Sequence, residues 1–297
     1  SKSTYISLKD SSVVTTGNNS AGTAVSARAM MKVENSTVST TGDSSPAIMI
    51  ADGGGILIAD GGSFTTSGAM SQGIYSKGDV TVTNASVNAL NAKAAVLKGN
   101  NTITLSGTIL EGKETADTIP YNIVLFSDEK DIGTMGTQHF DVRGGSLISH
   151  KGGMFYVTAT HGKISLNGTA ITMDDPAANL ITVAGNDGAN GWGTPGRNGG
   201  HVELVADNQV LTGNISVDSI SNINMTLKNN STFNGMISIV PNTEGGEKYK
   251  TNADVFIAAG STWNLTGNSP LTSLYNLGTI NYNGYTITLA DGTVMKA

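Results

Sequence analysis

The chain has 297 residues, of which 13% are charged and 5% aromatic; its formal net charge is −6, and it contains no cysteine. The absence of cysteine excludes disulfides and thiolate metal sites, and the scarcity of charged and aromatic residues argues against a helical surface and a wide globular core. Net negative charge without a dense Lys/Arg run argues against nucleic acid and anionic membranes as partners.

One short phrase recurs along the chain: an apolar residue, then Asn, Asp or Gly, then Ser or Thr, then a second apolar residue. It occurs in residues 8–17, 32–42, 105–112, 227–235 and 257–267. We take the closing apolar residue as the anchor of each repeat, and the anchors are Val13, Val38, Phe64, Val87, Ile109, Leu147, Ile171, Val210, Phe233, Trp263 and Val294. The first anchors lie 22 to 26 residues apart. This period predicts a solenoid.

Two-residue alternation of Val, Ile, Thr and Ser, bounded by Gly, Asn and Asp, indicates strands and tight turns, as in residues 80–87, 103–109 and 164–173. No segment shows a sustained helical stripe. Three short strands and three turns use one period. The sequence therefore predicts an all-β chain, a single three-strand parallel β-helix over residues 1–297. Eleven or twelve coils at about 4.8 Å each would make a rod of roughly 50–60 Å.

The phrase itself is explained as a corner of the coil. Asn, Asp and Gly tolerate the left-handed backbone that a tight corner needs. The Ser and Thr residues suit exposed strand faces and hydrogen bonds in turns, and the following apolar residue enters the narrow core. The phrase therefore predicts scaffold rather than chemistry.

Four insertions interrupt the period. Residues 111–121 separate a second strand from a third, whereas 127–139, 185–200 and 241–253 each follow a third strand. We expect the latter three to leave one edge of the rod, about 10 Å apart along its axis. Long loops on one side of a rigid ladder are the usual place for binding.

The predicted ligand-binding residues lie in these edge loops. A loop tryptophan stacks on sugar rings or apolar patches, and loop cations pair with carboxylate or sulfate. The alternatives are a tryptophan that plugs the ladder and charges that are simply solvated. The residues are Trp192, Arg197, Lys130, His139, Lys248, Tyr249 and Lys250.

No metal, cofactor or catalytic residue is predicted. His139, His150 and His161 are spaced eleven residues apart, but nothing in the sequence places them on one face. Asp174 and Asp175 are adjacent and cannot be assumed to face each other across a glycosidic bond. We therefore expect no enzyme, and the alternative is a polysaccharide lyase or glycoside hydrolase.

The repeats resemble the passenger domains of bacterial type V autotransporter adhesins. The resemblance rests on residues 32–50, on "MTLKNNSTFNG" (225–235) and above all on residues 255–289. Within the last segment the matching positions are Ser261, Trp263, Thr266, Gly267, Ser269, Leu271, Leu274, Asn276, Gly278 and Ile280. The family implies a right-handed β-helix at the bacterial cell surface or outside the cell, whose signal peptide and membrane-anchoring barrel would lie outside these residues.

The family also implies adhesion, aggregation or biofilm formation. We therefore expect an adhesin module that binds host glycans or extracellular-matrix glycoproteins, or that self-associates. A third alternative is a spacer stalk without any ligand. The resemblance concerns repeat style and carries no particular ligand to this chain.

Overall fold

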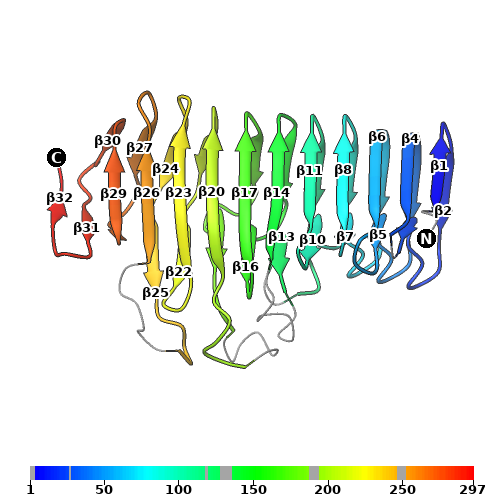
Figure 1. Ribbon diagram of the computed structural model, residues 1–297, viewed down its shortest axis with the longest axis horizontal. Coiled ribbons are helices and arrows are strands. Elements are labelled where there is room, and N and C mark those ends of the chain that lie inside the picture. The colour runs from blue at the N-terminus through cyan, green and yellow to red at the C-terminus, as the bar shows by residue number, and fades with distance from the viewer. Residues whose placement is uncertain (1–3, 27, 118–119, 128–135, 187–193, 246–251) are drawn as a thin grey trace.

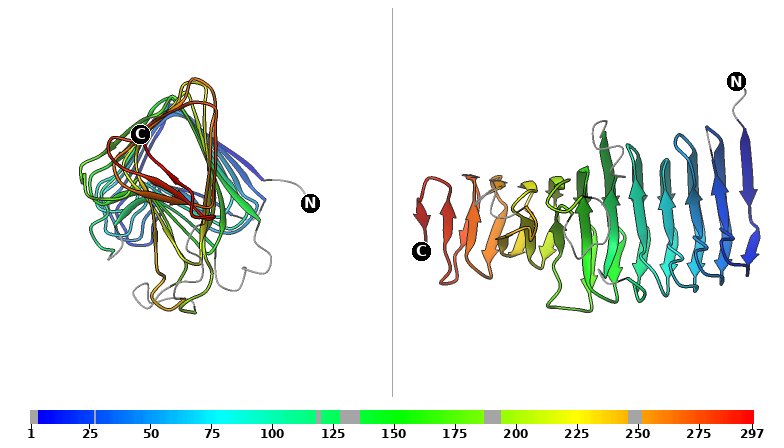
Figure 2. Two further views of the ribbon diagram at one scale, coloured as in Figure 1. Left: turned by 90° about the vertical axis from the view of Figure 1, so that its left-hand side faces the viewer. Right: turned by 90° about the horizontal axis from the view of Figure 1, so that it is seen from below.

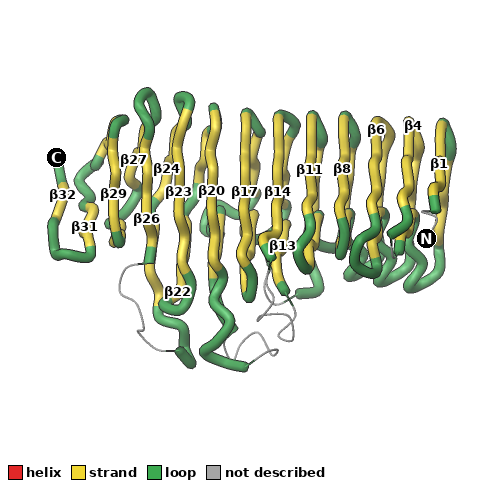
Figure 3. The backbone as a smooth tube through the Cα atoms, in the orientation of Figure 1, coloured by secondary structure: helices red, strands yellow, loops and turns green. Residues whose placement is uncertain are grey.

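The computed structural model describes residues 4–26, 28–117, 120–127, 136–186, 194–245 and 252–297. Every regular element among these residues is a β-strand (Figure 3). The strands stack side by side in chain order along one axis, so that the N- and C-terminal coils lie at opposite ends of a rod (Figure 1). Seen along that axis, the chain winds around a roughly triangular cross-section (Figure 2).

The first face of the rod collects the first strand of every coil. Its strands pair in parallel in a continuous ladder. They are β1 (Tyr5–Lys9), the first parts of β4 (Met30–Thr40) and β6 (Ile56–Thr66), β8 (Asp79–Thr83), β11 (Thr102–Ser106), β14 (Thr137–Arg143), β17 (His161–Asn167), β20 (His201–Asp207), β23 (Asn222–Lys228), β26 (Ala253–Ile257) and β29 (Ser273–Asn276).

The second face collects the second strands. Its ladder is interrupted between β18 and β21, which belong to different sheets. The strands are β2 (Ser12–Thr15), the last parts of β4 and β6, β9 (Ser86–Ala89), β12 (Ile109–Gly112), β15 (Ser146–Ser149), β18 (Ala170–Met173), β21 (Val210–Thr212), β24 (Thr232–Gly235), β27 (Thr262–Leu265) and β30 (Thr279–Asn281).

The third face collects the third strands and ends in a short antiparallel pair. Strand β32 (Val294–Met295) runs antiparallel to β31, in contrast to the parallel pairing of the coils. The third strands are β3 (Thr23–Val25), β5 (Ile48–Ile50), β7 (Ile74–Ser76), β10 (Ala95–Lys98), β13 (Tyr121–Phe126), β16 (Gly153–Thr158), β19 (Ile181–Val183), β22 (Ile215–Asp218), β25 (Ile237–Val240), β28 (Ser269–Leu271) and β31 (Ile287–Leu289).

The described strands thus make eleven coils of three strands, and the predicted all-β, three-strand parallel β-helix is confirmed. Alternation sets the packing within each strand. In β17, for example, Ile164 and Leu166 are buried while Lys163 and Ser165 point outward. Because successive side chains in a strand point to opposite faces, each inward residue stacks on its register partner one coil away. These stacks make one continuous apolar core along the rod.

The second face shows which anchors of the repeat are right. Val13, Val38, Phe64 and Val87 are register partners in consecutive coils, and Phe233 pairs with Trp263. Three anchors are wrong. Val87 pairs with Leu110 rather than with its exposed neighbour Ile109, and Phe233 pairs with Leu211 rather than with exposed Val210. Val294 lies in the antiparallel end piece, and Ile280 occupies the last rung.

The corner between the first and second strands explains the recurring phrase. Asn35 and Gly107 have φ values of 44° and 57°, in the left-handed region that these residue types tolerate. The sequence predicted that the Ser or Thr that follows is exposed, whereas in the structure it is buried. Ser231 Oγ accepts a hydrogen bond from Gln209 N at 3.0 Å, and Thr108 Oγ1 donates to Val82 O at 3.0 Å. These hydroxyls therefore link successive coils inside the corner.

The long connections are distributed unequally among the three corners. Residues 113–120 join a second strand to a third strand, whereas 127–136, 184–200 and 241–252 all join a third strand to the next first strand. These three connections follow the fifth, seventh and ninth coils, so each pair is separated by two coils, or about 10 Å along the axis. The described parts of the last two extend from the same side of the rod (Figures 1 and 2).

Candidate functional site

The outer surface of the first face, beside the three long connections, is polar and hollowed. Its side chains come from the outward positions of β14, β17, β20 and β23, which alternate with the buried core positions. Register places them in rows that run along the rod. One row is Thr102, His139, Lys163, Glu203, Asn224 and Asp254.

A groove follows these rows over several coils. Its largest section has a volume of about 770 Å³, and two sections of about 320 and 410 Å³ continue it through shared lining residues. We call this continuous surface the first-face groove. Its outward polar lining includes Thr104, Ser106, Asp141, Arg143, His161, Lys163, Ser165, Asn167, His201, Glu203, Asp207, Asn222, Asn224, Thr226, Lys228 and Asp254.

Charge in the largest section of the groove is balanced. Lys163 Nζ lies 3.0 Å from Glu203 Oε1, and Lys228 Nζ lies 3.3 Å from Asp207 Oδ2. Hydrogen bonds from Asn229 and from Lys228 lower the pKa of Asp207 below its ordinary value, which favours the carboxylate. These pairs are partly exposed, so they contribute little to folding. The groove therefore offers fixed polar groups without a strong field of one sign.

Three of the four histidines lie on this face. His139 pairs in register with Lys163, and His161 pairs with His201. The rings of His161 and His201 are 4.7 Å apart. Burial, and then the neighbouring ring of His201, lower the pKa of His161 below its ordinary value. The sequence alone did not place His139 and His161 on one face, whereas the register between β14 and β17 does.

His150 lies elsewhere, after a second strand. Its Nδ1 is 2.7 Å from Asp174 Oδ2 and its Nε2 is 2.8 Å from Glu111 Oε1. Hydrogen bonds to Asp174 and then to Glu111 raise the pKa of His150 above its ordinary value. The adjacent Asp175 instead accepts a hydrogen bond from Ala177 N. The two aspartates thus make different local contacts.

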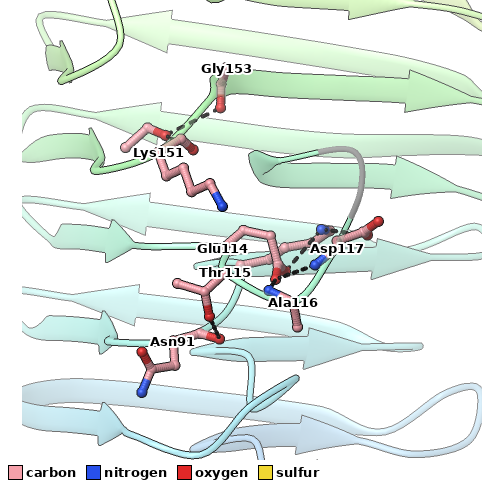
Figure 4. Close-up of polar contacts among 9 residues, drawn as sticks. Asn91, Glu114, Thr115, Ala116, Asp117, Lys151 and Gly153 are labelled. Carbon is pink, nitrogen blue, oxygen red and sulfur yellow. Dashed lines mark hydrogen bonds and ion pairs between the residues drawn. The ribbon is translucent and has the colours of Figure 1, made fainter.

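A second polar cluster holds the 113–120 connection against the coil. Glu114 is buried, and its carboxylate accepts hydrogen bonds from Ala116 N at 2.8 Å and Asp117 N at 3.0 Å (Figure 4). Lys93 Nζ lies 3.0 Å from Glu114 Oε2 and 2.8 Å from Asp117 Oδ2. The Thr115 hydroxyl donates to Asn91 O (Figure 4). Because its polar groups satisfy one another, this cluster is structural.

The base of the long connections is also anchored by buried polar groups. Asp218 Oδ2 accepts hydrogen bonds from Gly185 N at 2.8 Å and from Asn242 Nδ2 at 2.7 Å. Asn242 Nδ2 also lies 3.2 Å from Asn186 O, and Asn252 Nδ2 donates to Asp218 O. One buried carboxylate therefore ties the 184–200 and 241–252 connections to the same corner.

The structure describes two of the predicted ligand-binding residues. His139 lies on the outer first face, where its register partner Lys163 lines the groove. Arg197 is exposed near the base of its connection, and its carbonyl accepts a hydrogen bond from Asn186 N at 2.8 Å. The other five lie outside the described residues: Trp192, Lys130, Lys248, Tyr249 and Lys250.

The sequence analysis missed most of the groove. Lys163, Glu203, Asp207 and Lys228 sit within repeat strands, which we took as scaffold. A signal was present, because "HGKISLN" (161–167) and "HVELVAD" (201–207) place His and a charged residue at matching outward positions.

Within the described residues, no group of three or more His, Asp or Glu side chains is placed to hold a metal ion. The same part of the chain contains no helix long and apolar enough to cross a membrane.

Comparison with known proteins gives one structural similarity. The fold is similar to that of the autotransporter UpaB from E. coli strain CFT073, with 14% sequence identity, 95% of this chain and 71% of that chain covered, and a TM-score of 0.46. UpaB is an autotransporter, the class whose passenger domains the repeats of this chain resemble. No family model and no curated protein matches.

Proposed function

We propose that the chain is an adhesin module, secreted or displayed at the bacterial surface, that binds an extended host glycan or matrix glycoprotein along its first-face groove. The observation that carries the proposal is the continuity of the groove over consecutive coils, beside three connections that emerge at one corner. A long polymer needs repeated contacts along one direction, and the rows of outward side chains recur every coil, at about 4.8 Å.

The composition of the groove supports binding of a polar polymer. Hydroxyls, amides and paired charges line it, and such groups exchange hydrogen bonds with water for hydrogen bonds with a ligand at little net cost. We propose binding without cleavage, because Glu203 and Asp207 are already held in ion pairs with lysines. New reducing ends or double bonds after incubation with polysaccharides would contradict this part.

The test obstructs the groove without touching the core. Ser165 points outward in the groove, and Thr81 occupies the same row three coils earlier, outside it. We expect Ser165→Tyr to lose binding to the ligand that gives the strongest signal on an array of glycans and matrix proteins. Thr81→Tyr should keep it. Equal binding by both variants, or no ligand for the unmodified protein, would overturn the proposal.

Self-association is a second candidate function, favoured by an amide ladder on the outer second face. Asn264 Nδ2 donates to Asn234 Oδ1, and Asn281 Nδ2 donates to Asn264 Oδ1, each at 2.7 Å. Each ladder amide keeps a further N–H and lone pair for a partner. If two copies associate through this ladder, Asn264→Arg should abolish the dimer in sedimentation velocity while Thr81→Arg should not. An unchanged sedimentation coefficient in both variants would exclude the ladder as the interface.

A further inference from the structure

A pair of aromatic rings continues an outward row of the first-face groove, one coil beyond the groove residue Thr226. Phe256 on β26 and Tyr275 on β29 are register partners, and their rings stack with centroids 5.5 Å apart and an interplanar angle of 21°. Both point outward, because the alternate positions Val255 and Ile257 are buried in the core. Tyr275 is 63% exposed. The pair therefore presents an accessible apolar surface at one end of a polar groove.

Hydrogen-bonding groups accompany the rings in the neighbouring row. Asp254 precedes Phe256 by two residues on the same side of β26, so the two positions lie about 7 Å apart. The Ser273 hydroxyl donates to Asp254 Oδ1. Asp254 also lines the end section of the groove together with Asn224, which is exposed. The arrangement combines an aromatic platform, a carboxylate and an amide on one surface.

We propose that this end of the first-face groove is a subsite for a neutral hexopyranose unit, with the sugar ring packed against the face of Tyr275 that the stacked ring of Phe256 leaves open. One face of such a ring carries several C–H groups, and these match the apolar, electron-rich face of an aromatic side chain. The hydroxyls at its edge are both donors and acceptors, which suits Asp254 and Asn224. The subsite rests on the proposed function, because it selects one unit of the bound glycan.

Charge distinguishes a neutral sugar from an acidic one. Asp254 is the carboxylate next to the platform, and an unpaired like charge on the ligand would be repelled. Lys228, diagonally across on β23, is held 3.3 Å from Asp207 Oδ2. Uronic acids and sulfated sugars would therefore meet a carboxylate without a free cation among the described neighbours of the platform.

The experiment measures binding of defined tetrasaccharides by calorimetry. The neutral probes are β-1,4-linked glucose and β-1,4-linked galactose tetramers, and the acidic probe is a galacturonate tetramer. The variants are Tyr275→Ser and Phe256→Thr; threonine is compatible with this position because Thr226 is its register partner one coil earlier. The matched control is Tyr5→Ser, an exposed tyrosine at the opposite end of the same face.

We expect the unmodified protein to bind at least one neutral tetramer more tightly than the acidic one. Tyr275→Ser should weaken that binding by about tenfold or more, as truncation of an aromatic anchor does. Phe256→Thr should weaken it less, because it removes only the ring on which Tyr275 stacks. Tyr5→Ser should bind unchanged. Circular dichroism and thermal melting of each variant identify any loss of binding that comes from unfolding.

The outcomes separate the subsite from the proposed function. If Tyr275→Ser binds as tightly as the unmodified protein while Ser165→Tyr does not bind, the groove binds glycan and the aromatic subsite is wrong. Tighter binding of the acidic tetramer also overturns the subsite, but it does not contradict glycan binding in the groove. If the unmodified protein binds no glycan on the array and no tetramer, both the function as glycan binding and the subsite are overturned.

Discussion

The first four coils and the following six share one core but differ outside it. In the first four, the third corner is closed by at most a few residues, and the outer first face begins with the apolar residues Tyr5, Met30 and Ile56. In the next six, long connections follow alternate coils, and the corresponding row continues as His139, Lys163 and Glu203. Outward and corner positions thus vary while inward positions stay apolar.

In a solenoid the inward positions hold the coils together, whereas the outward and corner positions can vary independently of them. Each coil contacts only its neighbours, so an insertion at a corner leaves the rungs on either side in register. Strands β13, β14 and β17 illustrate this, because their pairing continues unbroken on both sides of the connection at 127–136. The groove could therefore change without loss of the ladder that supports it.

The largest expected effect tests whether the core is equivalent in both regions. Phe64 and Trp263 are inward residues of the second face on opposite sides of the break in its ladder, and both are fully buried. Replacement of either by alanine should lower the free energy of unfolding by about 3–5 kcal/mol. Trp263→Ala also leaves Gly235 O without the indole donor at 2.9 Å. Urea unfolding monitored by circular dichroism measures both.

The controls for the core substitutions are outward neighbours on the same strands. Thr65→Ala and Thr262→Ala should change the free energy of unfolding by no more than about 0.5 kcal/mol. A core effect confined to one of the two coils would show that the two regions do not share an equivalent core.

The next effect compares the polar anchors of the two regions. Asp218→Ala removes the acceptor of Gly185 N and Asn242 Nδ2 at the base of the long connections, and should cost about 2–3 kcal/mol. Ser45→Ala removes a corner hydroxyl that accepts from Ser20 N at 3.0 Å in the regular region, and should cost about 1–2 kcal/mol. Chemical unfolding measures the loss of unfolding free energy in both variants. A larger loss for Ser45→Ala would show that the corner hydroxyl contributes more to stability than the Asp218 carboxylate.

A smaller effect concerns pH, where two histidines act in opposite directions. The pKa of His150 is raised by its carboxylate partners, so its stabilising contribution is complete below the unfolded pKa near 6.5 and is lost as pH rises through the folded pKa. The pKa of His161 is lowered by burial and by His201. The unfolded chain therefore takes up a proton first as pH falls below about 6.5, and stability declines there.

Titration of the imidazole protons by NMR, assigned with His150→Gln and His161→Gln, measures both pKa values. The His150 resonance should titrate above, and the His161 resonance below, a histidine in an unfolded peptide. If the two titrate together, the environments assigned to them are wrong.

The smallest effect is expected in the groove itself. Glu203→Gln breaks the pair with Lys163, but both side chains are partly exposed, so the free energy of unfolding should change by no more than about 0.5 kcal/mol. Asp141→Asn, another groove carboxylate, serves as the comparison variant. A loss above about 1 kcal/mol on chemical unfolding would mean that the groove charges stabilise the fold, as the inward residues do.

The fold was predictable because it follows from local periodicity. Alternation in "KISL" and "ITLS", with Asn or Gly directly after each, specifies the strand and the corner that follows it in these coils. The exact register between neighbouring strands was less predictable. Ile109 and Leu110 are both apolar neighbours, and only the register with Val87 decides that Leu110 faces the core. A shift of one residue reverses which side chains are buried.

The strands, the corners and the positions of the insertions follow from the pattern of neighbouring residues along the chain. The tertiary structure decided which side chains meet across coils. His161 and His201 are forty residues apart in the chain, and they become neighbours because the insertion at 184–200 does not change the register between β17 and β20. The number of residues between two positions gives the length of the connection between their strands. Whether their side chains are close in space depends on the register between the strands, which is set by packing of the whole coil.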